Sequence, residues 1–289
     1  MADSGQDSVD AGSEPSTSTG HVTPGGIQTP VYTGEEFQDR TYRMNSEKRG
    51  LAIIFDNKKF KNKPTRTGTD KDAGKMYQRF MELGFTVNMH PNKKASEMKS
   101  IIKKVAASDF TSYDCFACVI LSYGEEGLVY GTDEPVQIED FVDPFKKTPS
   151  LAGKPKLFFI QACDREEPEG GDDVNDAMCV AESVADAPSG SLETHIIPKE
   201  ADILIAHSTV PGYFSWQGHR QRGSWFIQAF CDVLKKFGTK EDLLNMMQRV
   251  NCKVAYEFEF NAKFEFLERN KQLPCITSML TKEVRFYSK

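Results

Sequence analysis

Short apolar runs alternate along the chain with longer stretches in which apolar residues recur every three or four positions. Runs of the first kind are typical of buried strands, and the second pattern is typical of amphipathic helices. The pattern predicts strands over 51–55, 86–89, 115–122, 156–162, 201–208 and 283–288, and helices over 67–85, 95–108, 137–147, 224–238 and 239–260. Because strands alternate with helices, we expect an α/β domain with a mostly parallel central sheet.

The run 115–122 is apolar throughout. Strands of that kind occur where helices cover both faces of a sheet, so the expected architecture has three layers. The helix over 67–85 carries its own end signals. Thr69 and Asp72 suit a capping-box start, and Gly84 suits the end of the helix.

Two segments depart from this pattern. Residues 1–40 are rich in Ser, Thr, Gly, Pro and Asp and hold too few apolar residues to offset the entropy of ordering. We expect them to form a disordered, prodomain-like segment. Residues 164–196 combine acids, Gly, Pro and Ser with little periodicity, and we interpret them as an acidic linker. The linker divides the ordered sequence into a larger region over 41–163 and a smaller one over 197–289.

The net charge of −6 is concentrated in these two segments, and the rest of the chain is mildly basic. It contains no focused basic stripe of the kind that nucleic acid requires, so no nucleic-acid partner is expected. The longest strongly apolar run, 115–121, is far too short to span a bilayer. The N-terminus lacks the pattern of a signal peptide, and we expect no membrane association.

The seven cysteines are an odd number scattered through apolar stretches, which favours reduced thiols and a cytoplasmic location. Cys115 and Cys118 form a C-x-x-C without a second pair of ligands, so we expect them to pack in the core. The chain has no G-x-G-x-x-G after its first strand and no P-loop, which argues against a nucleotide-binding protein. No metal and no cofactor are expected.

Candidate chemistry lies where two predicted strands end. Tyr123 directly follows the run 115–122, and Cys163 directly follows the run 156–162. Because sites in such sheets form beyond the carboxyl ends of parallel strands, we expect both residues at the same edge. A cysteine nucleophile ordinarily works with a histidine base, whereas the residue offered here is a tyrosine.

Six stretches in fixed order carry a family resemblance: RTGTDKDA, LSYGEEG, KPKLFFIQAC, EADILIAHSTVPGYFSW, GSWFIQAF and LPCITSMLTKEV. Over roughly residues 40–289 the chain resembles the caspases, and most closely the executioner caspases. The resemblance implies a caspase-like three-layer sandwich in which 41–163 is large-subunit-like and 197–289 is small-subunit-like. It also implies the chemistry of an Asp-specific cysteine endopeptidase and pairing of chains through the small-subunit-like region.

Several site residues of the family are matched. By this resemblance, Cys163 is the nucleophile, and Arg66 and Gln161 hold the aspartate of the substrate. The backbone N–H groups of Gly124 and Cys163 match the two donors of the oxyanion hole.

The chain departs from the family at the reacting centre. Tyr123 stands where the family has histidine, and Asp164 and Arg165 follow Cys163 where the family has Arg-Gly or Gln-Gly. A phenol has a pKa of about 10, so it is a poor base for a thiol and a mismatched acid for a departing amine. Losing one such group typically costs about 10²–10⁴ in rate. A carboxylate at position 164, if it lies within about 4–6 Å, would also raise the pKa of the thiol.

A third departure lies in the substrate-lining loop. Ser215 and Trp216 match the family, but Gln217 replaces an arginine of the specificity pocket, in a loop that looks one residue longer than usual. Arginine binds a carboxylate as a charged two-pronged fork, and removing such a partner costs on the order of 2–5 kcal/mol. His207 and His219 are candidates for a substitute base, although the position of His207 at a strand end favours a core histidine.

These departures predict a catalytically impaired caspase homologue, a pseudocaspase, which dimerises with or modulates active caspases in apoptotic signalling. The partner is a second copy of the chain or an active caspase. The alternative is an active Asp-specific cysteine endopeptidase, an executioner caspase with an unusual catalytic base. Asp10 and Asp186 each precede a small residue and resemble processing sites, so the chain is expected to be a substrate of upstream caspases.

Overall fold

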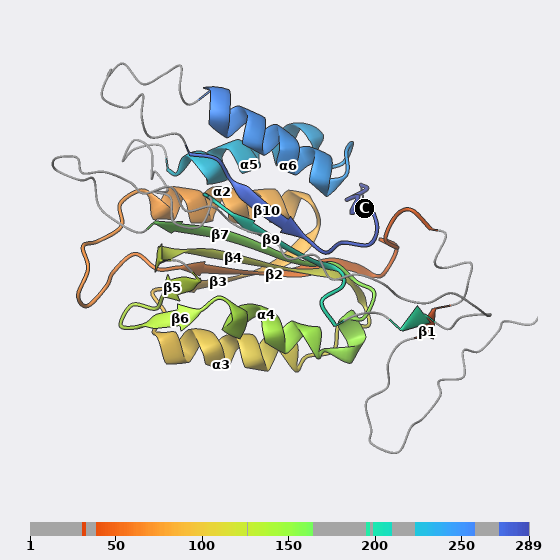
Figure 1. The fold of residues 1–289 in the computed structure, drawn as a ribbon, viewed down its shortest axis with the longest axis horizontal. Coiled ribbons are helices and arrows are strands. Elements are labelled where there is room, and N and C mark those ends of the chain that lie inside the picture. The colour runs from red at the N-terminus through yellow and green to blue at the C-terminus, as the bar shows by residue number, and fades with distance from the viewer. Residues whose placement is uncertain are drawn as a thin grey trace, which may run out of the picture.

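The computed structural model describes residues 31–32, 39–125, 127–163, 195–196, 199–209, 223–257 and 272–288. The segment predicted to be disordered, 1–40, and the predicted linker, 164–196, fall almost entirely outside the described residues. Within the described part, strands and helices alternate and assemble around one central sheet (Figure 1).

The central sheet has the strand order β10-β9-β7-β4-β2-β3. Its strands are β2 (Lys48–Asp56), β3 (Phe85–Pro91), β4 (Tyr113–Glu125), β7 (Lys156–Cys163), β9 (Ile203–His207) and β10 (Cys275–Ser278). All neighbours pair in parallel except β10, which runs antiparallel to β9. At its carboxyl end β4 also pairs with β5 (Leu128–Tyr130), which pairs in turn with β6 (Pro135–Gln137). A separate two-stranded ladder joins β1 (Val31–Tyr32) to β8 (His195–Ile196).

Helices cover both faces of the sheet (Figure 1). One face carries α2 (Thr69–Glu82), α5 (Trp225–Phe237) and α6 (Leu243–Cys252), the last continuing into a π-helical turn over Lys253–Glu257. The other face carries α3 (Ala95–Ala106) and α4 (Glu139–Lys146), followed by a 3-10 turn over Pro149–Leu151. The predicted three-layer sandwich with a mostly parallel sheet is confirmed.

The middle strand β4 is buried on both faces, as its apolar sequence predicts. Cys115 and Cys118 are both fully buried, but alternation along the strand places them in different clusters. Cys115 packs in the cluster under α2 and α5, and Cys118 packs in the cluster under α3 and α4. The C-x-x-C pair is therefore core packing, as predicted, and the two thiols point away from each other.

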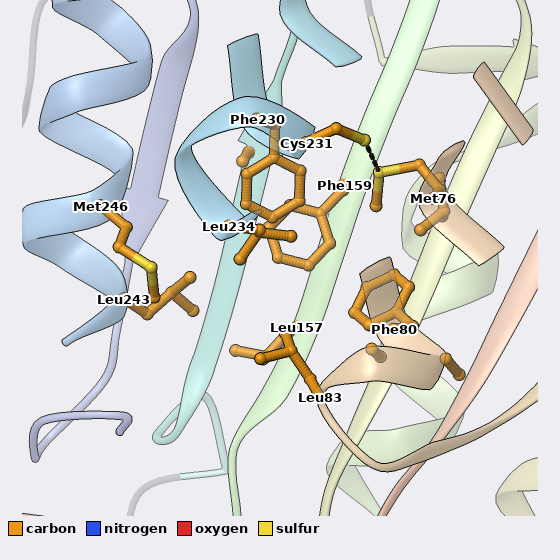
Figure 2. Packing of buried hydrophobic residues seen from close by; sticks show 14 of the residues in the cluster. Met76, Phe80, Leu83, Leu157, Phe159, Phe230, Cys231, Leu234, Leu243 and Met246 are labelled. Carbon is orange, nitrogen blue, oxygen red and sulfur yellow. Dashed lines mark hydrogen bonds between the residues drawn. The ribbon is translucent and has the colours of Figure 1, made fainter. Parts of the chain in front are cut away.

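Figure 2 shows how α5 is attached to the sheet and to α2. The rings of Phe159 on β7 and Phe230 on α5 lie 4.5 Å apart, and the Cys231 thiol approaches the sulfur of Met76 at 3.5 Å. Fully burying side chains of this size stabilises the fold by about 1.5–3 kcal/mol each. The region after residue 197 is thus held to the region before residue 163 through a shared apolar core.

The capping box predicted at Thr69 and Asp72 is wrong. The residue that precedes α2 is Gly68 with φ of 87°, and no side chain caps the helix. The Thr69 hydroxyl donates instead to Asp56, and the Asp72 carboxylate accepts from the main-chain N–H of Ser224. Both side chains therefore form hydrogen bonds with residues that are distant in sequence, and neither caps the helix.

The strand predicted over 283–288 is also wrong. In this region only Glu283 forms a bridge, to Thr41, and the residues after it have no strand partner within the described part of the chain. Val284 and Phe286 are buried in the core, which explains their alternating apolar pattern. The strand near the C-terminus is β10, which begins at Cys275, eight residues before the predicted start.

Candidate active site

Two strand ends meet at the carboxyl edge of the sheet. The parallel register of β4 and β7 pairs Tyr123 with Cys163 and Ser122 with Ala162. Neighbouring strands lie about 4.8 Å apart, so the main chains at positions 123 and 163 are side by side. The fold therefore brings together the position of the candidate nucleophile, Cys163, and the position of the expected base, which Tyr123 occupies. The side chain of Cys163 lies outside the described part of the structure.

Tyr123 is buried against the loop between β2 and α2, with 6% of the residue exposed. Its hydroxyl donates a hydrogen bond of 3.3 Å to the main-chain carbonyl of Pro64, and its ring meets Phe60 edge-on at 4.9 Å. Two cations lie near the same ring, with Lys63 Nζ at 5.3 Å and Arg66 Cζ at 5.9 Å from the centroid. Because cations are attracted to an aromatic face, these contacts hold the ring against the loop.

Gly124 follows on β4, and the packing there requires a residue without a side chain. A Cβ atom would lie 2.5 Å from the Cβ of Ala162 and 2.7 Å from the carbonyl oxygen of Leu128. Glycine thus allows β4 to approach β7 and β5 closely at this point. The main chain at 124 remains beside β7, where the resemblance to caspases expects one donor of an oxyanion hole.

Arg66 lies near the end of the loop that enters α2, and its side chain is almost fully buried. Its Nη1 donates to the carbonyl of Asn57 and to the Thr69 hydroxyl, both at 3.3 Å. Within the described part of the chain, its Nε is buried without a hydrogen-bond partner, and the guanidinium forms no ion pair. Burying a charge in this way is costly unless a partner arrives, so the group is suited to an external carboxylate. Gln161, the second residue expected at this pocket, is fully buried on β7.

Two buried carboxylates near Arg66 are engaged by other donors. The Thr69 hydroxyl donates to Asp56 at 2.5 Å, and the Ser224 N–H donates to both oxygens of Asp72 at 3.0 Å. Burial raises the pKa of Asp72 to about 6, against the opposing effects of the Ser224 hydrogen bonds and of Arg66. Burial also raises the pKa of Asp56, against the Thr69 hydrogen bond and Arg66. Because other donors bind these carboxylates, the Nε of Arg66 is left for a ligand.

Asp72 also joins the two parts of the chain that flank the predicted linker, because it lies on α2 and contacts the residues that lead into α5. Gly223 has φ of +90°, and a Cβ there would lie 2.1 Å from an Asp72 oxygen. A left-handed backbone and the absence of a side chain are therefore both required at position 223. Sequence reasoning missed this contact, and its one local sign is the glycine before Ser224.

His207 is the candidate for a substitute base that the structure describes. His207 pairs with Ile160, whose side chain packs under α3 and α4, so the two side chains share that face of the sheet. Tyr123 lies two residues after Leu121 on β4 and therefore shares its face, which packs under α2 and α5. By this alternation His207 and Tyr123 lie on opposite faces of the sheet. Burial lowers the pKa of His207, which disfavours an imidazolium. These observations favour the core histidine expected from its place at a strand end.

The other predicted site residues lie outside the described part of the chain: Ser215, Trp216 and Gln217 of the substrate-lining loop, His219, Asp164 and Arg165, and the processing candidates Asp10 and Asp186. Within the described part, no group of three or more His, Cys, Asp or Glu side chains is placed to hold a metal ion. No helix among the described residues is long and apolar enough to cross a membrane.

Comparison with known proteins decides the family. The sequence model of the family described as "Caspase domain" matches residues 49–285. The chain belongs to the caspase family. It is 42% identical over 255 residues to caspase-7 of Gallus gallus, which covers 85% of this chain and 79% of the relative. It is 40% identical over 253 residues to caspase-3 of Bos taurus, covering 86% and 88% of the two chains.

A solved structure agrees with this assignment. The crystal structure of caspase-1 from Spodoptera frugiperda is 39% identical, covers 87% of this chain and 95% of its own, and superposes with a TM-score of 0.74. The predicted resemblance to caspases, with executioner-like relatives, is thereby confirmed, as is the caspase fold. The chain is a homologue of cysteine proteases that carries Tyr123 beside the position of Cys163.

Proposed function

We propose that this caspase is catalytically impaired and acts by binding, as a pseudocaspase that dimerises with or modulates active caspases in apoptotic signalling. One observation carries the proposal. The residue beside the nucleophile position is a buried tyrosine whose hydroxyl is committed to the carbonyl of Pro64. The family resemblance expects at this place a histidine that transfers protons.

The chemistry of peptide cleavage explains why this substitution matters. The Cys163 thiol would have to lose a proton to attack the peptide carbonyl, and the departing amine would have to gain one. An imidazole with a pKa near neutrality performs both transfers, whereas a phenol with a pKa of about 10 performs neither well. The tetrahedral oxyanion would still meet N–H donors at positions 124 and 163, so the first step is impaired less than the expulsion of the amine.

Binding of an aspartyl peptide is the capacity that the surroundings of Arg66 support. Arg66 is buried, lacks an ion pair among the described residues and has an unused Nε donor. Gln161 is buried on the neighbouring strand end. A pocket with a spare guanidinium favours a carboxylate ligand even if no bond in that ligand is cleaved.

Pairing of chains is supported by the edge of the sheet. β10 is the last strand in the sheet order and pairs within the described part only with β9. Thr277 and Ser278 on this strand are exposed. An edge strand presents unpaired main-chain groups that a second chain can join. We propose that β10 forms the interface of a homodimer or of a heterodimer with an active caspase.

The alternative function is an active Asp-specific cysteine endopeptidase with an unusual base. The observation in its favour is that the scaffold is intact: Cys163 ends β7 beside β4, Gly124 keeps its close approach, and Arg66 is buried in place. In this reading Asp10 and Asp186, outside the described residues, are processing sites that an upstream caspase cuts.

A fluorogenic tetrapeptide ending in Asp tests the proposal on the purified chain. We expect turnover at least about 10²-fold below that of an ordinary executioner caspase assayed in parallel. Turnover within about tenfold of that enzyme, abolished in a Cys163→Ala variant, would establish the alternative and end the pseudocaspase proposal.

A second arm tests partnership with an active caspase. An executioner caspase is mixed with increasing amounts of the chain, and its turnover and the size of the complexes are measured together. We expect a mixed species and a concentration-dependent change in the turnover of the active enzyme. A substitution of Ser278 by Pro, which removes a main-chain donor on the side of β10 that faces away from β9, should reduce complex formation. Unchanged turnover with no mixed species at any ratio argues against modulation through this edge.

A further inference from the structure

The loop that carries Arg66 connects β2 to α2 and is fixed to the body of the protein at its ends. Near its start, the N–H groups of Lys58 and Lys59 donate to the side-chain oxygen of Asn92. The N–H of Lys61 donates to the carbonyl of Thr132 at 2.8 Å, and the N–H of Arg66 donates back to Lys58 at 3.0 Å. The stretch 60–66, which we call the arch, is therefore held by hydrogen bonds near both of its ends.

The side chain of Tyr123 lies under this arch and contacts it repeatedly. Its hydroxyl donates to the carbonyl of Pro64, and its ring packs edge-on against Phe60. Lys63 and Arg66 lie near the same ring, at 5.3 Å and 5.9 Å from its centroid. One buried ring thus meets four residues of the loop, including the arginine that we place in the carboxylate pocket.

A second tyrosine, Tyr130 on β5, contacts the same loop. Lys63 Nζ lies 4.1 Å from the ring centroid of Tyr130 on β5, so the lysine is shared between two aromatic rings. The main-chain carbonyl of Tyr130 accepts from the Asn57 side chain at 2.9 Å, at the other end of the loop. Attraction of the lysine cation to both rings adds to the contacts that hold the loop in place.

We propose that Tyr123 is a positioning residue for substrate recognition, which anchors the arch over residues 60–66 and thereby fixes Arg66 for an aspartyl carboxylate. The proposal rests on the pocket assigned under the proposed function and deepens it. Tyr123 stands where the family has a proton-transferring histidine. It offers instead a wide aromatic ring and a hydroxyl that donates to the loop. The ligand class is a peptide that presents an aspartate side chain.

The charges around the ring explain why a tyrosine suits this place better than an imidazolium. Lys63 and Arg66 are both cations, and a charged imidazole at position 123 would be repelled by each. A neutral phenol ring attracts both. A histidine at position 123 would have a smaller ring, and in its protonated form it would exchange attraction for repulsion at the arch.

Hydrogen exchange of the full-length chain measures the anchoring directly and does not depend on activity. In Tyr123→Phe, which removes the hydroxyl that donates to Pro64, we expect main-chain amides of residues 61–66 to exchange about 3- to 10-fold faster. Tyr123→Ala should give a larger increase confined to the same segment. The matched control is Tyr113→Phe at the other end of β4, where the ring lies under Lys48 and no change in the loop is expected.

Ligand binding supplies the second readout. In a Cys163→Ala background, which excludes covalent capture, a fluorescent tetrapeptide ending in Asp is titrated against each variant. Tyr123→Phe should raise the dissociation constant about 3- to 10-fold, by a factor similar to the increase in the exchange rates of residues 61–66. Tyr113→Phe should leave the dissociation constant unchanged.

The outcomes separate this inference from the proposed function. Unchanged exchange over 61–66 in both Tyr123→Phe and Tyr123→Ala overturns the anchoring. Faster exchange with unaltered affinity shows that the arch does not position Arg66 and overturns the role in recognition. Efficient turnover by the wild-type chain would refute the pseudocaspase proposal and would leave the anchoring intact.

Discussion

The proposed carboxylate-binding half of the site, around Arg66, and the proposed reacting half, around Tyr123 and Cys163, are built differently. In the first, Arg66 is surrounded by buried polar groups that satisfy one another, with Asp56 held by Thr69 and Asp72 held by Ser224. In the second, the scaffold of two paired strand ends is kept, but the side chain at position 123 is a phenol bonded to a carbonyl. Under the proposed function, this difference corresponds to a protein that recognises aspartyl peptides better than it cleaves them.

The contrast also has a structural cause. The binding half depends on contacts between α2 and the start of α5, so each polar group there is constrained by several partners. The reacting half depends on one side chain, which can change without moving the strands that carry it. A single substitution can therefore remove proton transfer and leave the fold and the paired strand ends in place.

Restoring the reacting half should give the largest effect. The double variant Tyr123→His, Gln217→Arg returns an imidazole to the centre and an arginine to the substrate-lining loop. We expect kcat/KM for a fluorogenic Asp tetrapeptide to rise by about 10²–10⁴, because an acid–base group contributes on that order. Tyr123→His alone should raise kcat while also raising KM, since it loosens the Arg66 loop. If the double variant gains nothing, a further defect exists, and Asp164→Arg is the next substitution to add.

Removing the guanidinium should give the next largest effect, on affinity rather than on rate. In the Cys163→Ala background, Arg66→Ala should weaken binding of the fluorescent Asp tetrapeptide by about 30- to 1,000-fold, because a buried charged partner of a carboxylate is lost. Arg40→Ala is the matched control, since the Arg40 side chain is 89% exposed. Equal affinities of the two variants would remove Arg66 from the pocket.

The change with the smallest expected effect on function concerns stability, namely how the free energy of unfolding depends on pH. Burial raises the pKa of Asp72 to about 6 in the folded state, above its value of about 3.9 when unfolded. The folded state therefore binds the extra proton, and the free energy of unfolding contributed by this group falls as pH rises from about 4 to 6, by about 3 kcal/mol.

Denaturant unfolding at several pH values tests this sign. Relative to wild type, Asp72→Asn should show a shallower decline in the free energy of unfolding between about pH 4 and 6, because the titrating carboxyl is gone. Asp70→Asn, two residues earlier on the same helix and exposed, is the control and should retain the wild-type slope. Parallel slopes for wild type and Asp72→Asn would show that the Asp72 carboxyl is not buried as described.

Much of the fold could be predicted from sequence because its signals are strong and local. The wholly apolar run 115–122 predicted a strand covered on both faces, and β4 is that strand. The prediction failed at 283–288, where alternating apolar residues reflect burial of Val284 and Phe286 against the core rather than pairing with a strand. An alternating pattern reports which residues are buried and does not report what they are hydrogen-bonded to.

The candidate site divides in the same way. Tyr123 and Cys163 could be placed at one edge from the positions of two strand ends, whereas the roles of Thr69 and Asp72 could not be predicted. Their sequence context suited a helix cap, and a cap needs only neighbouring residues. Their actual partners are 13 and 152 residues away. Contacts at such separations leave no local pattern to read.

The sequence by itself determined the alternation of strands and helices, the family, and the exchange of a proton-transferring imidazole for a phenol, because each is written in residue identity and short-range spacing. Only the tertiary structure decided what that phenol does, which carboxylates surround Arg66, and which donors hold them away from it. Those outcomes depend on the burial of charge and on hydrogen bonds between segments that meet only after the sheet has formed.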